Sequence, residues 1–269
     1  MTGAGSATRR AAGVVAVLLL VGGTGYAAGH MPAPPMTDIA WPVATAGAPA
    51  EVTGQADPDS AVVGGDVETV QNQVATPVPR AAEPWVAAMS TVTGIGAVAL
   101  RAYADATLHL AASDPGCAVG WTTLAAIGAV ESGHGTHGGT QLGADGRPGI
   151  PIIGPPLDGT PGTAAIRAGV DDREWHGDPT WAHAVGPMQF LPSTWRRWAS
   201  DGDGDGQSDP NDIDDAALAA GRYLCASGSL ADGDGWRTAI LSYNHSDAYV
   251  ALVLETANHY ADASRSAAG

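Results

Sequence analysis

The segment from Asp201 to Asp212 constrains the chain most, because its acidic residues alternate too regularly for an ordinary surface loop. It reads Asp-Gly-Asp-Gly-Asp-Gly-Gln-Ser-Asp-Pro-Asn-Asp. Carboxylates crowded this closely repel one another, and a divalent cation removes that cost. An EF-hand calcium loop places oxygen ligands at positions 1, 3, 5, 7, 9 and 12, with glycine at position 6. The spacing therefore predicts a calcium loop held between two helices.

The predicted ligands are Asp201, Asp203, Asp205, Gln207, Asp209 and Asp212, with Gly206 at the turn. Flanking helices are expected over residues 193–200 and 213–226. Asp212 is one methylene shorter than the usual glutamate, so we expect a weak structural Ca²⁺ site and no organic cofactor. A solvated Asp/Gly loop is the alternative. The similar Asp232-Gly-Asp-Gly has Trp236 at its fifth position and is predicted to be an ordinary turn.

The charge balance bears on partners. The chain carries a net charge of −16, with 12 basic residues that are all arginine. Binding to nucleic acid needs basic patches to neutralise phosphates, so a nucleic-acid partner is not expected.

The N-terminal segment, residues 1–29, resembles an export signal. Arg9 and Arg10 precede an apolar stretch that begins at Ala11. This pattern fits either a cleaved signal peptide or an N-terminal membrane anchor. The protein is therefore expected outside the cytoplasm, secreted or anchored to the outer face of the cytoplasmic membrane. Contact with a membrane is expected only through this segment, if it is uncleaved.

Two further regions follow along the chain. Residues 30–82 are rich in proline, alanine and glycine and are predicted to form a disordered linker. Residues 83–269 are predicted to form one mainly α-helical domain with long loops. Helices are expected over residues 84–112 and 120–132, the second ending at Gly133. Some fifty residues rich in glycine and proline come next, and helical patterning returns from 185 to 260.

The only two cysteines are Cys117 and Cys225. In an exported protein these residues are free to pair, and a disulfide between them is expected. Two separate buried thiols are the alternative.

One acidic residue, Glu131, ends the otherwise apolar segment that begins at Trp121. At helical spacing it shares a face with Leu124 and Ile127. Burial and the negative end of the helix dipole would both raise its pKa, as a general acid requires. A solvent-facing glutamate at a frayed helix end fits equally well. A zinc site formed with His134 and His137 is disfavoured, because both histidines follow the helix stop.

Three segments together resemble a known family. They are the helix ending Val130-Glu-Ser-Gly133, the run Ala184-Val-Gly-Pro-Met-Gln-Phe-Leu-Pro-Ser-Thr-Trp195, and Ala239-Ile-Leu-Ser-Tyr-Asn244. With the acidic loop just after the second, they resemble lytic transglycosylases of the lysozyme-like superfamily, most closely the membrane-bound transglycosylase B type. The resemblance spans about 116–260.

The resemblance implies a lysozyme-like helical domain that binds peptidoglycan glycan strands. Glu131 matches the catalytic acid/base. The residues matching substrate-binding positions are Ser132, Met188, Gln189, Phe190, Tyr243 and Asn244. Met188, Phe190 and Tyr243 would also fit a purely structural role. Proteins of wall synthesis or division are further expected partners.

The family reaction implies cleavage of the β-1,4 bond between N-acetylmuramic acid and N-acetylglucosamine, leaving a 1,6-anhydromuramyl end. Two alternatives stay open: a hydrolytic muramidase and a non-catalytic peptidoglycan-binding or scaffold protein. A muramidase needs a second carboxylate. Residues 136–183 offer Asp145, Asp158, Asp171, Asp172, Glu174 and Asp178. A calcium sensor is disfavoured because only one complete loop is present.

Overall fold

The computed structural model describes residues 79–160 and 163–267, and within these ranges the fold is helical. The elements are α1 (Glu83–Thr93), α2 (Ala97–Ser113), α3 (Trp121–Ser132), the 3₁₀ helix η1 (His137–Gly139), α4 (Arg173–His176), α5 (Pro192–Trp198), α6 (Ile213–Cys225), α7 (Gly233–Tyr243) and α8 (Asp247–Ala267). The described residues form isolated β-bridges but no strand. The prediction of a mainly α-helical, lysozyme-like fold is confirmed. Segment 1–29 and linker residues 30–78 lie outside the described residues.

The single long helix expected over 84–112 is instead two helices, α1 and α2. Gly94 adopts a left-handed conformation with φ of 73° and ends α1, and Gly96 precedes α2. The two helix axes differ in direction by 119°. Ile95, between the glycines, is buried in the core. The bend lets α1 pack against both α2 and α8.

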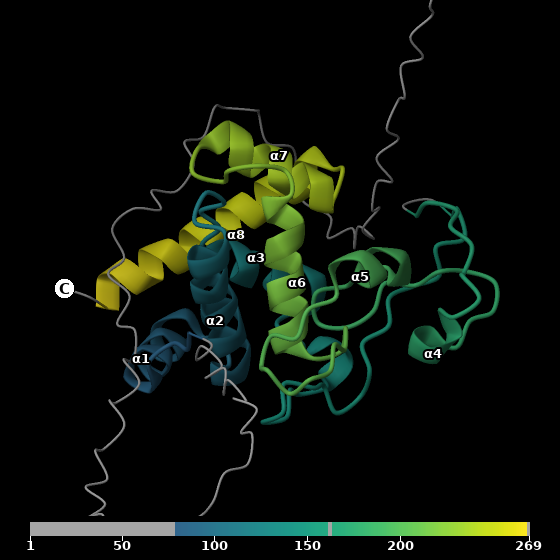
Figure 1. Cartoon of the computed structure of the whole chain (residues 1–269), viewed down its shortest axis with the longest axis horizontal. Coiled ribbons are helices and arrows are strands. Elements are labelled where there is room, and N and C mark those ends of the chain that lie inside the picture. Colours follow the sequence, from purple (N-terminus) through teal and green to yellow (C-terminus); the bar gives the residue numbers. More distant parts are fainter. Residues whose placement is uncertain (1–78, 161–162, 268–269) are drawn as a thin grey trace, which may run out of the picture.

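The core lies where α2, α3, α6 and α8 meet. Helix α2 packs against α6 and α3, and α3 packs against α8 (Figure 1). Alanine dominates the buried positions of α6, which allows close approach of neighbouring helices. The Trp236 indole on α7 donates to Thr123 on α3 over 3.1 Å, so a buried hydrogen bond joins these helices as well.

A disulfide between Cys117 and Cys225 closes this core, with the two Cα atoms 5.1 Å apart. It joins the segment before α3 to the last residue of α6. The backbone N–H of Leu230 donates to the Cys117 carbonyl over 2.7 Å and reinforces the same junction. The predicted cysteine pairing is confirmed.

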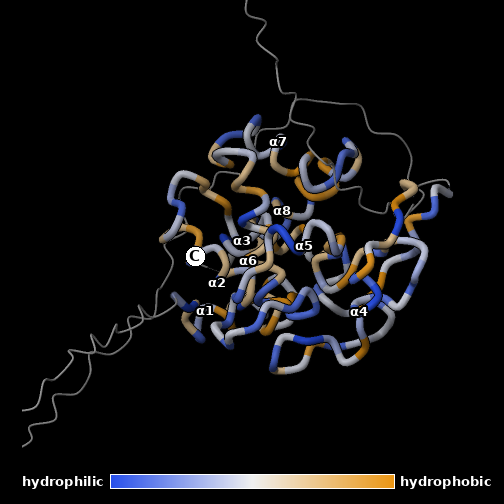
Figure 2. The backbone as a smooth tube through the Cα atoms, turned by 45° about the vertical axis from the view of Figure 1, so that its right-hand side comes forward, coloured by the Kyte–Doolittle hydropathy of each residue, from blue (hydrophilic) through white to orange (hydrophobic). Residues whose placement is uncertain are grey.

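The glycine- and proline-rich residues between α3 and α5 form a lobe beside the helices (Figure 1). It carries only η1 and α4 among the described residues. A small apolar cluster of its own consists of Leu157, Ala182, Ala184 and Leu191. The strongly hydrophilic stretch at α4 lies at the periphery (Figure 2). Helical structure resumes at Pro192, later than the expected 185, because residues 186–189 form a turn.

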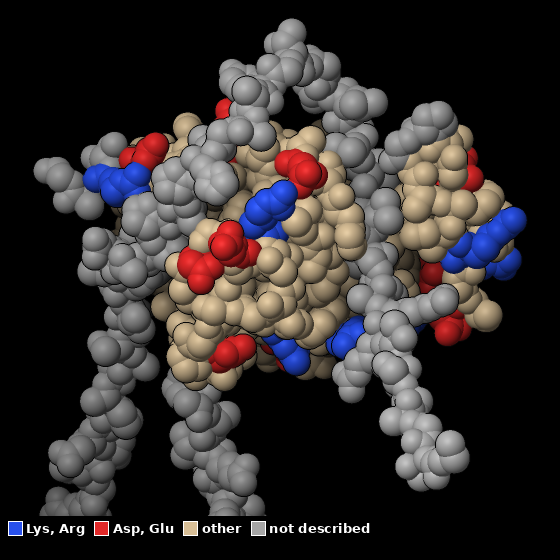
Figure 3. Space-filling view, turned by 90° about the horizontal axis from the view of Figure 1, so that it is seen from above, with Lys and Arg blue, Asp and Glu red and all other residues tan. Residues whose placement is uncertain are grey.

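Contacts begin before the expected domain boundary at residue 83. The Ala81 backbone N–H donates to the buried Asp105 carboxylate over 2.6 Å, and Arg80 pairs with the same carboxylate at 3.2 Å. On the face shown in Figure 3, acidic and basic side chains lie interspersed. Among the described residues no single helix is long and apolar enough to cross a membrane; the bent pair α1 and α2 passes that test on length and composition alone.

Candidate functional site

Helix α3 places its only acidic residue at the edge of the core. Every side chain from Trp121 to Ile127 is buried. A Cβ atom at Gly128 would lie 2.0 Å from the Tyr103 hydroxyl, so only glycine fits there. The helix ends at Gly133, which adopts φ of 60° as expected for a C-terminal glycine stop. Glu131 therefore lies in the last turn of a helix whose preceding side chains are packed in the core.

The Glu131 carboxyl is partly buried and accepts a hydrogen bond from Tyr249 on α8. The Tyr249 hydroxyl lies 2.6 Å from Glu131 Oε1. Burial raises the pKa of Glu131 from 4.5 to about 7, although the Tyr249 hydrogen bond acts in the opposite direction. Part of the carboxyl population thus stays protonated at neutral pH, the state that a general acid requires.

The turn at residues 186–189 is tied to the helices through its backbone carbonyls. Ser132 Oγ donates to the Pro187 carbonyl over 2.6 Å and accepts from the Gly135 N–H over 2.8 Å. The Tyr243 hydroxyl donates to the Met188 carbonyl over 2.7 Å. Ser132 and Tyr243, both predicted to bind substrate, therefore hold the turn in place.

The three motif residues after Pro187 differ in exposure. Met188 and Phe190 are 0% and 2% exposed and belong to the main core, so their side chains offer no surface to a ligand. Gln189 is partly exposed, adopts φ of 50°, and its Nε2 donates to the Gly186 carbonyl over 2.9 Å. Of these three, only Gln189 presents surface to a glycan. Sugar contact by any of them stays a prediction.

Asn244 follows Tyr243 at the end of α7. Its side chain is 3% exposed, and its Nδ2 has no hydrogen-bond partner among the described residues. A buried amide with a free donor is costly unless a ligand or water completes it. The predicted substrate contact of Asn244 stays a prediction, and this free donor is compatible with it.

The histidines after α3 do not join Glu131 in a metal site. His134 Nδ1 lies 3.2 Å from the Tyr103 hydroxyl and its Nε2 lies 2.9 Å from the Tyr260 hydroxyl. Both ring nitrogens are thus engaged, and burial lowers the pKa of His134 to about 4. His137 is exposed on η1. The disfavoured zinc site is not formed by the described residues.

The acidic loop gathers a carboxylate set that differs from the predicted one. Carboxylate oxygens of Asp201, Asp203 and Asp215 lie within 4.8 Å of one another, close enough that they could hold a cation. Asp215 also accepts from the N–H groups of Gly202 and Asp209, at 2.7 and 2.8 Å. Burial raises the pKa of Asp215 to about 7. The loop thus closes at its fifteenth residue, three residues beyond the twelfth position expected from the EF-hand spacing.

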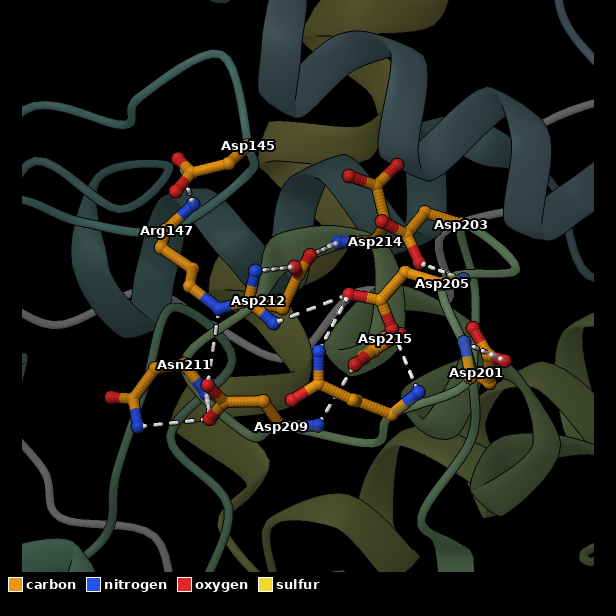
Figure 4. Close-up of polar contacts among 12 residues, drawn as sticks. Asp145, Arg147, Asp201, Asp203, Asp205, Asp209, Asn211, Asp212, Asp214 and Asp215 are labelled. Carbon is orange, nitrogen blue, oxygen red and sulfur yellow. Dashed lines mark hydrogen bonds and ion pairs between the residues drawn. The ribbon is translucent and has the colours of Figure 1, made fainter.

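The predicted ligand Asp212 has a different role in the structure. It is the N-cap of α6, accepting from the Asp214 N–H over 2.9 Å, and is fully buried. Arg147, from the lobe, lies 3.2 Å from Asp212 and from Asp209, and 3.8 Å from Asp205 (Figure 4). Three of the six predicted ligands therefore pair with this guanidinium. Gln207 is exposed, and its Nε2 donates to Asp205 over 3.3 Å.

Two residues of the site were missed from the sequence. Tyr249 lies six residues beyond Tyr243, in the first turn of α8, where no local pattern marks it. Asp215 follows Asp214 in the first turn of α6, where acidic residues are common for reasons of helix dipole. Counting carboxylates beyond position 12 of the loop would have included Asp215.

Comparison with known proteins gives one match. Residues 166–238 match the model of the Transglycosylase SLT domain family. No curated protein and no solved structure gave a significant match. The matched stretch contains part of the lobe, the 186–189 turn, the acidic loop and α6, while Glu131 precedes it. Over this stretch the chain is similar to the Transglycosylase SLT domain, which supports a likeness to lytic transglycosylases.

Proposed function

We propose that this protein is a peptidoglycan lytic transglycosylase in which Glu131 is the single acid/base. The observation that carries the proposal is the Glu131 carboxyl at the edge of the core, oriented by Tyr249 over 2.6 Å and with its pKa raised to about 7. The Transglycosylase SLT domain match over 166–238 supports the substrate class, the glycan strand of peptidoglycan.

The reaction needs one group that gives and then takes a proton. Protonated Glu131 donates its proton to the glycosidic oxygen between N-acetylmuramic acid and N-acetylglucosamine, and the C1–O bond breaks with release of the N-acetylglucosamine hydroxyl. The resulting carboxylate then removes the proton of the muramyl 6-hydroxyl. That oxygen bonds to C1 and forms the 1,6-anhydro ring, which leaves Glu131 protonated for the next cycle. Water is not consumed.

Three of the six lobe carboxylates that the hydrolytic alternative could use already have structural partners. Asp158 accepts from the Thr160 N–H, Asp172 is buried in a pair with Arg196, and Asp178 accepts from two backbone N–H groups. These three carboxylates bind other groups of the protein and help to hold the lobe together. Among the described residues, no hydrogen bond or ion pair joins any of the six candidate carboxylates to Glu131. A hydrolase would need one of them about 5 Å away, or further off with a water between.

Product analysis tests the proposal. Purified peptidoglycan is digested and the fragments are analysed by mass spectrometry; we expect 1,6-anhydromuramyl ends, each 18 Da lighter than a hydrolysed end by the mass of the water that is not consumed. Glu131→Gln should abolish cutting and retain glycan binding, while Glu255→Gln, an exposed carboxylate on α8, should cut normally. Reducing ends would support the muramidase instead. Binding without any cutting by the wild type would support the scaffold protein.

We also propose that Ca²⁺ binds the acidic loop as a structural ion, held by Asp201, Asp203 and Asp215. Hard oxygen ligands gathered within 4.8 Å fit this cation. Bound there, Ca²⁺ would supply only the charge that keeps the carboxylates together between α5 and α6. It takes no part in the proton transfers of Glu131.

Melting temperature tests the calcium proposal and the position at which the loop closes. For an extracellular-type site at 10 mM Ca²⁺, binding stabilises by about 1.4–2.7 kcal/mol. Asp215→Asn should abolish the rise in melting temperature on adding Ca²⁺. Asp212→Asn should lower the baseline melting temperature and keep the rise. If Asp212→Asn loses the rise on adding Ca²⁺ and Asp215→Asn keeps it, Asp212 is a ligand and the twelve-residue EF-hand loop is supported instead.

The proposed place of action is outside the cytoplasm, where the substrate is. Segment 1–29 would export the chain, and residues 30–82 would let the domain reach the wall. Sequencing the mature N-terminus distinguishes a cleaved signal peptide from an anchor. Proteins of wall synthesis or division stay proposed partners.

A further inference from the structure

A second group of charged side chains, away from Glu131, lies in the lobe around His183. His183 Nδ1 is 2.6 Å from the carbonyl oxygen of Gly154, and its Nε2 is 3.2 Å from Asp178 Oδ2. A backbone carbonyl only accepts hydrogen bonds. Asp178 is also an acceptor, because hydrogen bonds from the Thr180 N–H, the His183 ring and the Trp181 N–H lower its pKa to about 2. Both ring nitrogens of His183 must therefore carry a proton for both bonds to form.

The neighbouring histidine is neutral in the same arrangement. His176 Nδ1 accepts from the Asp178 N–H over 3.2 Å, so this nitrogen carries no proton. The two rings lie 4.8 Å apart between centroids. Burial, and then the charge of His183, lower the pKa of His176. Two positively charged rings at this separation would repel each other, so the spacing favours one charged and one neutral imidazole.

Three charged groups near this pair already have partners. Asp172, behind His176, binds Arg196, and Arg167 lies over the Trp181 ring. On the segment that carries Gly154, the nearest acidic residue, Asp158, is bonded to Thr160 and Thr163. Asp178 is thus the only carboxylate that pairs with the His183 ring among the described residues.

Gly154 connects His183 to Gln189, one of the residues predicted to contact the glycan. Its N–H donates to the Ala184 carbonyl over 2.9 Å, so the chain here runs beside residues 183–185. A Cβ atom at Gly154 would lie 2.7 Å from Gln189 Oε1. The Gln189 side chain therefore lies directly against the Gly154 backbone, while its Nε2 donates to Gly186. The position of the Gly154 backbone therefore limits that of Gln189, the one partly exposed residue of the 186–189 turn.

We propose that His183, as an imidazolium, is a positioning residue for Gln189: it binds the Gly154 carbonyl and the Asp178 carboxylate at once, and glycan binding weakens when the ring loses one proton. The inference rests on the proposed function only in taking the ligand to be a glycan strand. A neutral ring keeps one of the two bonds and leaves the other acceptor unpaired.

Two measurements test the proposal without using catalysis. The first is ¹⁵N NMR of the histidine rings at pH 5.5, which should show both His183 nitrogens protonated and a neutral His176. The second is the Kd of a soluble peptidoglycan glycan fragment on Glu131→Gln protein between pH 5 and 9. This background removes the titration of Glu131 itself. We expect Kd to rise about three- to tenfold with pH, which is the net contribution of one ordinary hydrogen bond.

Two substitutions at the pair should remove this pH dependence in opposite ways. Asp178→Asn can keep its oxygen toward Thr180 and Trp181 and turn its NH₂ toward His183, so a neutral ring is satisfied and tight binding persists to pH 9. The glutamine in His183→Gln has a single donor group and can satisfy only one of the two acceptors, Gly154 or Asp178. This variant should therefore bind the glycan about three- to tenfold more weakly at every pH. His109→Gln, on α2, is the matched control and should follow the wild type.

Gly154→Ala separates positioning from general stability. Its methyl group would displace the end of the Gln189 side chain without altering the His183 bonds, so binding should weaken equally at all pH values with an unchanged NMR spectrum. A His183 ring that is neutral at pH 5.5, or a Kd that rises equally in Asp178→Asn, would overturn the proposal. If Glu131→Gln binds no glycan at any pH, the proposed function fails, and the NMR result still decides the state of His183.

Discussion

The proposed acid at Glu131 should cost the protein stability at neutral and alkaline pH. Its pKa rises from 4.5 to about 7 on folding, mainly because of burial. Below pH 4.5 the carboxyl is protonated in both the folded and the unfolded chain, so it does not change the free energy of unfolding. Between pH 4.5 and 7 the unfolded chain releases its proton first, so the free energy of unfolding falls. Above pH 7 the loss reaches a constant value.

The magnitude follows from the shift. About 2.5 pKa units, from 4.5 to about 7, correspond to about 3 kcal/mol, an upper figure because the carboxyl is partly exposed. Glu131→Gln has no ionisation and keeps an oxygen to accept from Tyr249. The variant should therefore match the wild type near pH 4 and exceed it by up to about 3 kcal/mol at pH 8. For a domain of this size that is about 6–12 °C in melting temperature.

The assay is urea unfolding of both proteins at pH values from 4 to 8.5, in the same salt. Any effect of the amide on packing is independent of pH and cancels from the slope of the difference. Glu255→Gln, at an exposed position of α8, should give a flat difference from the wild type. A flat difference for Glu131→Gln as well would refute the raised pKa and with it the general-acid argument.

Three further predictions concern the supports of the site. Tyr249→Phe removes the hydrogen bond that lowers the pKa of Glu131, so the alkaline limb of the pH–activity profile should move to higher pH while kcat falls about tenfold or more. Gly186→Ala should destabilise by about 2–4 kcal/mol in urea unfolding, since its Cβ would lie 1.8 Å from the Pro210 carbonyl at φ of 76°; Gly177→Ala, with φ of 77° and nothing within 4 Å, should cost only about 1–2 kcal/mol. Replacing both disulfide cysteines by alanine should lower the free energy of unfolding by about 2–5 kcal/mol, and an unchanged midpoint would show that the packing at that junction suffices.

The sequence predicted those features that local chemistry determines. Gly133 ends α3 where expected, because a left-handed residue is needed after the last turn. The prediction of one helix from Pro84 to Ala112 was wrong. The chain breaks at Gly94 and Gly96 because the packing of α1 against α8 stabilises the bend, and this contact cannot be read from the local sequence. Asp232 was taken for part of a turn and is instead the N-cap of α7, accepting from the Gly235 N–H over 2.8 Å.

The parts of the site that escaped prediction depend on contacts between distant elements. Tyr249 reaches Glu131 across 118 residues of sequence, and Arg147 reaches the acidic loop from the lobe. Neither contact leaves a periodic signal in the chain. Whether Asp212 or Asp215 faces Asp201 depends on where α6 begins. Local spacing could indicate a cation loop, but not the residue that closes it.

The Gly-Pro-Met-Gln-Phe motif has a structural reason to be specified so tightly. Three successive carbonyls of its turn are each taken by a side chain: Gly186 by Gln189, Pro187 by Ser132 and Met188 by Tyr243. Ser132 lies next to Glu131, and Tyr243 lies on the helix before Tyr249. The turn and the acid are therefore fixed to each other through backbone oxygens, while Met188 and Phe190 pack in the core. In this arrangement most motif residues set the distance between Gln189 and Glu131, whose side chains are both partly exposed.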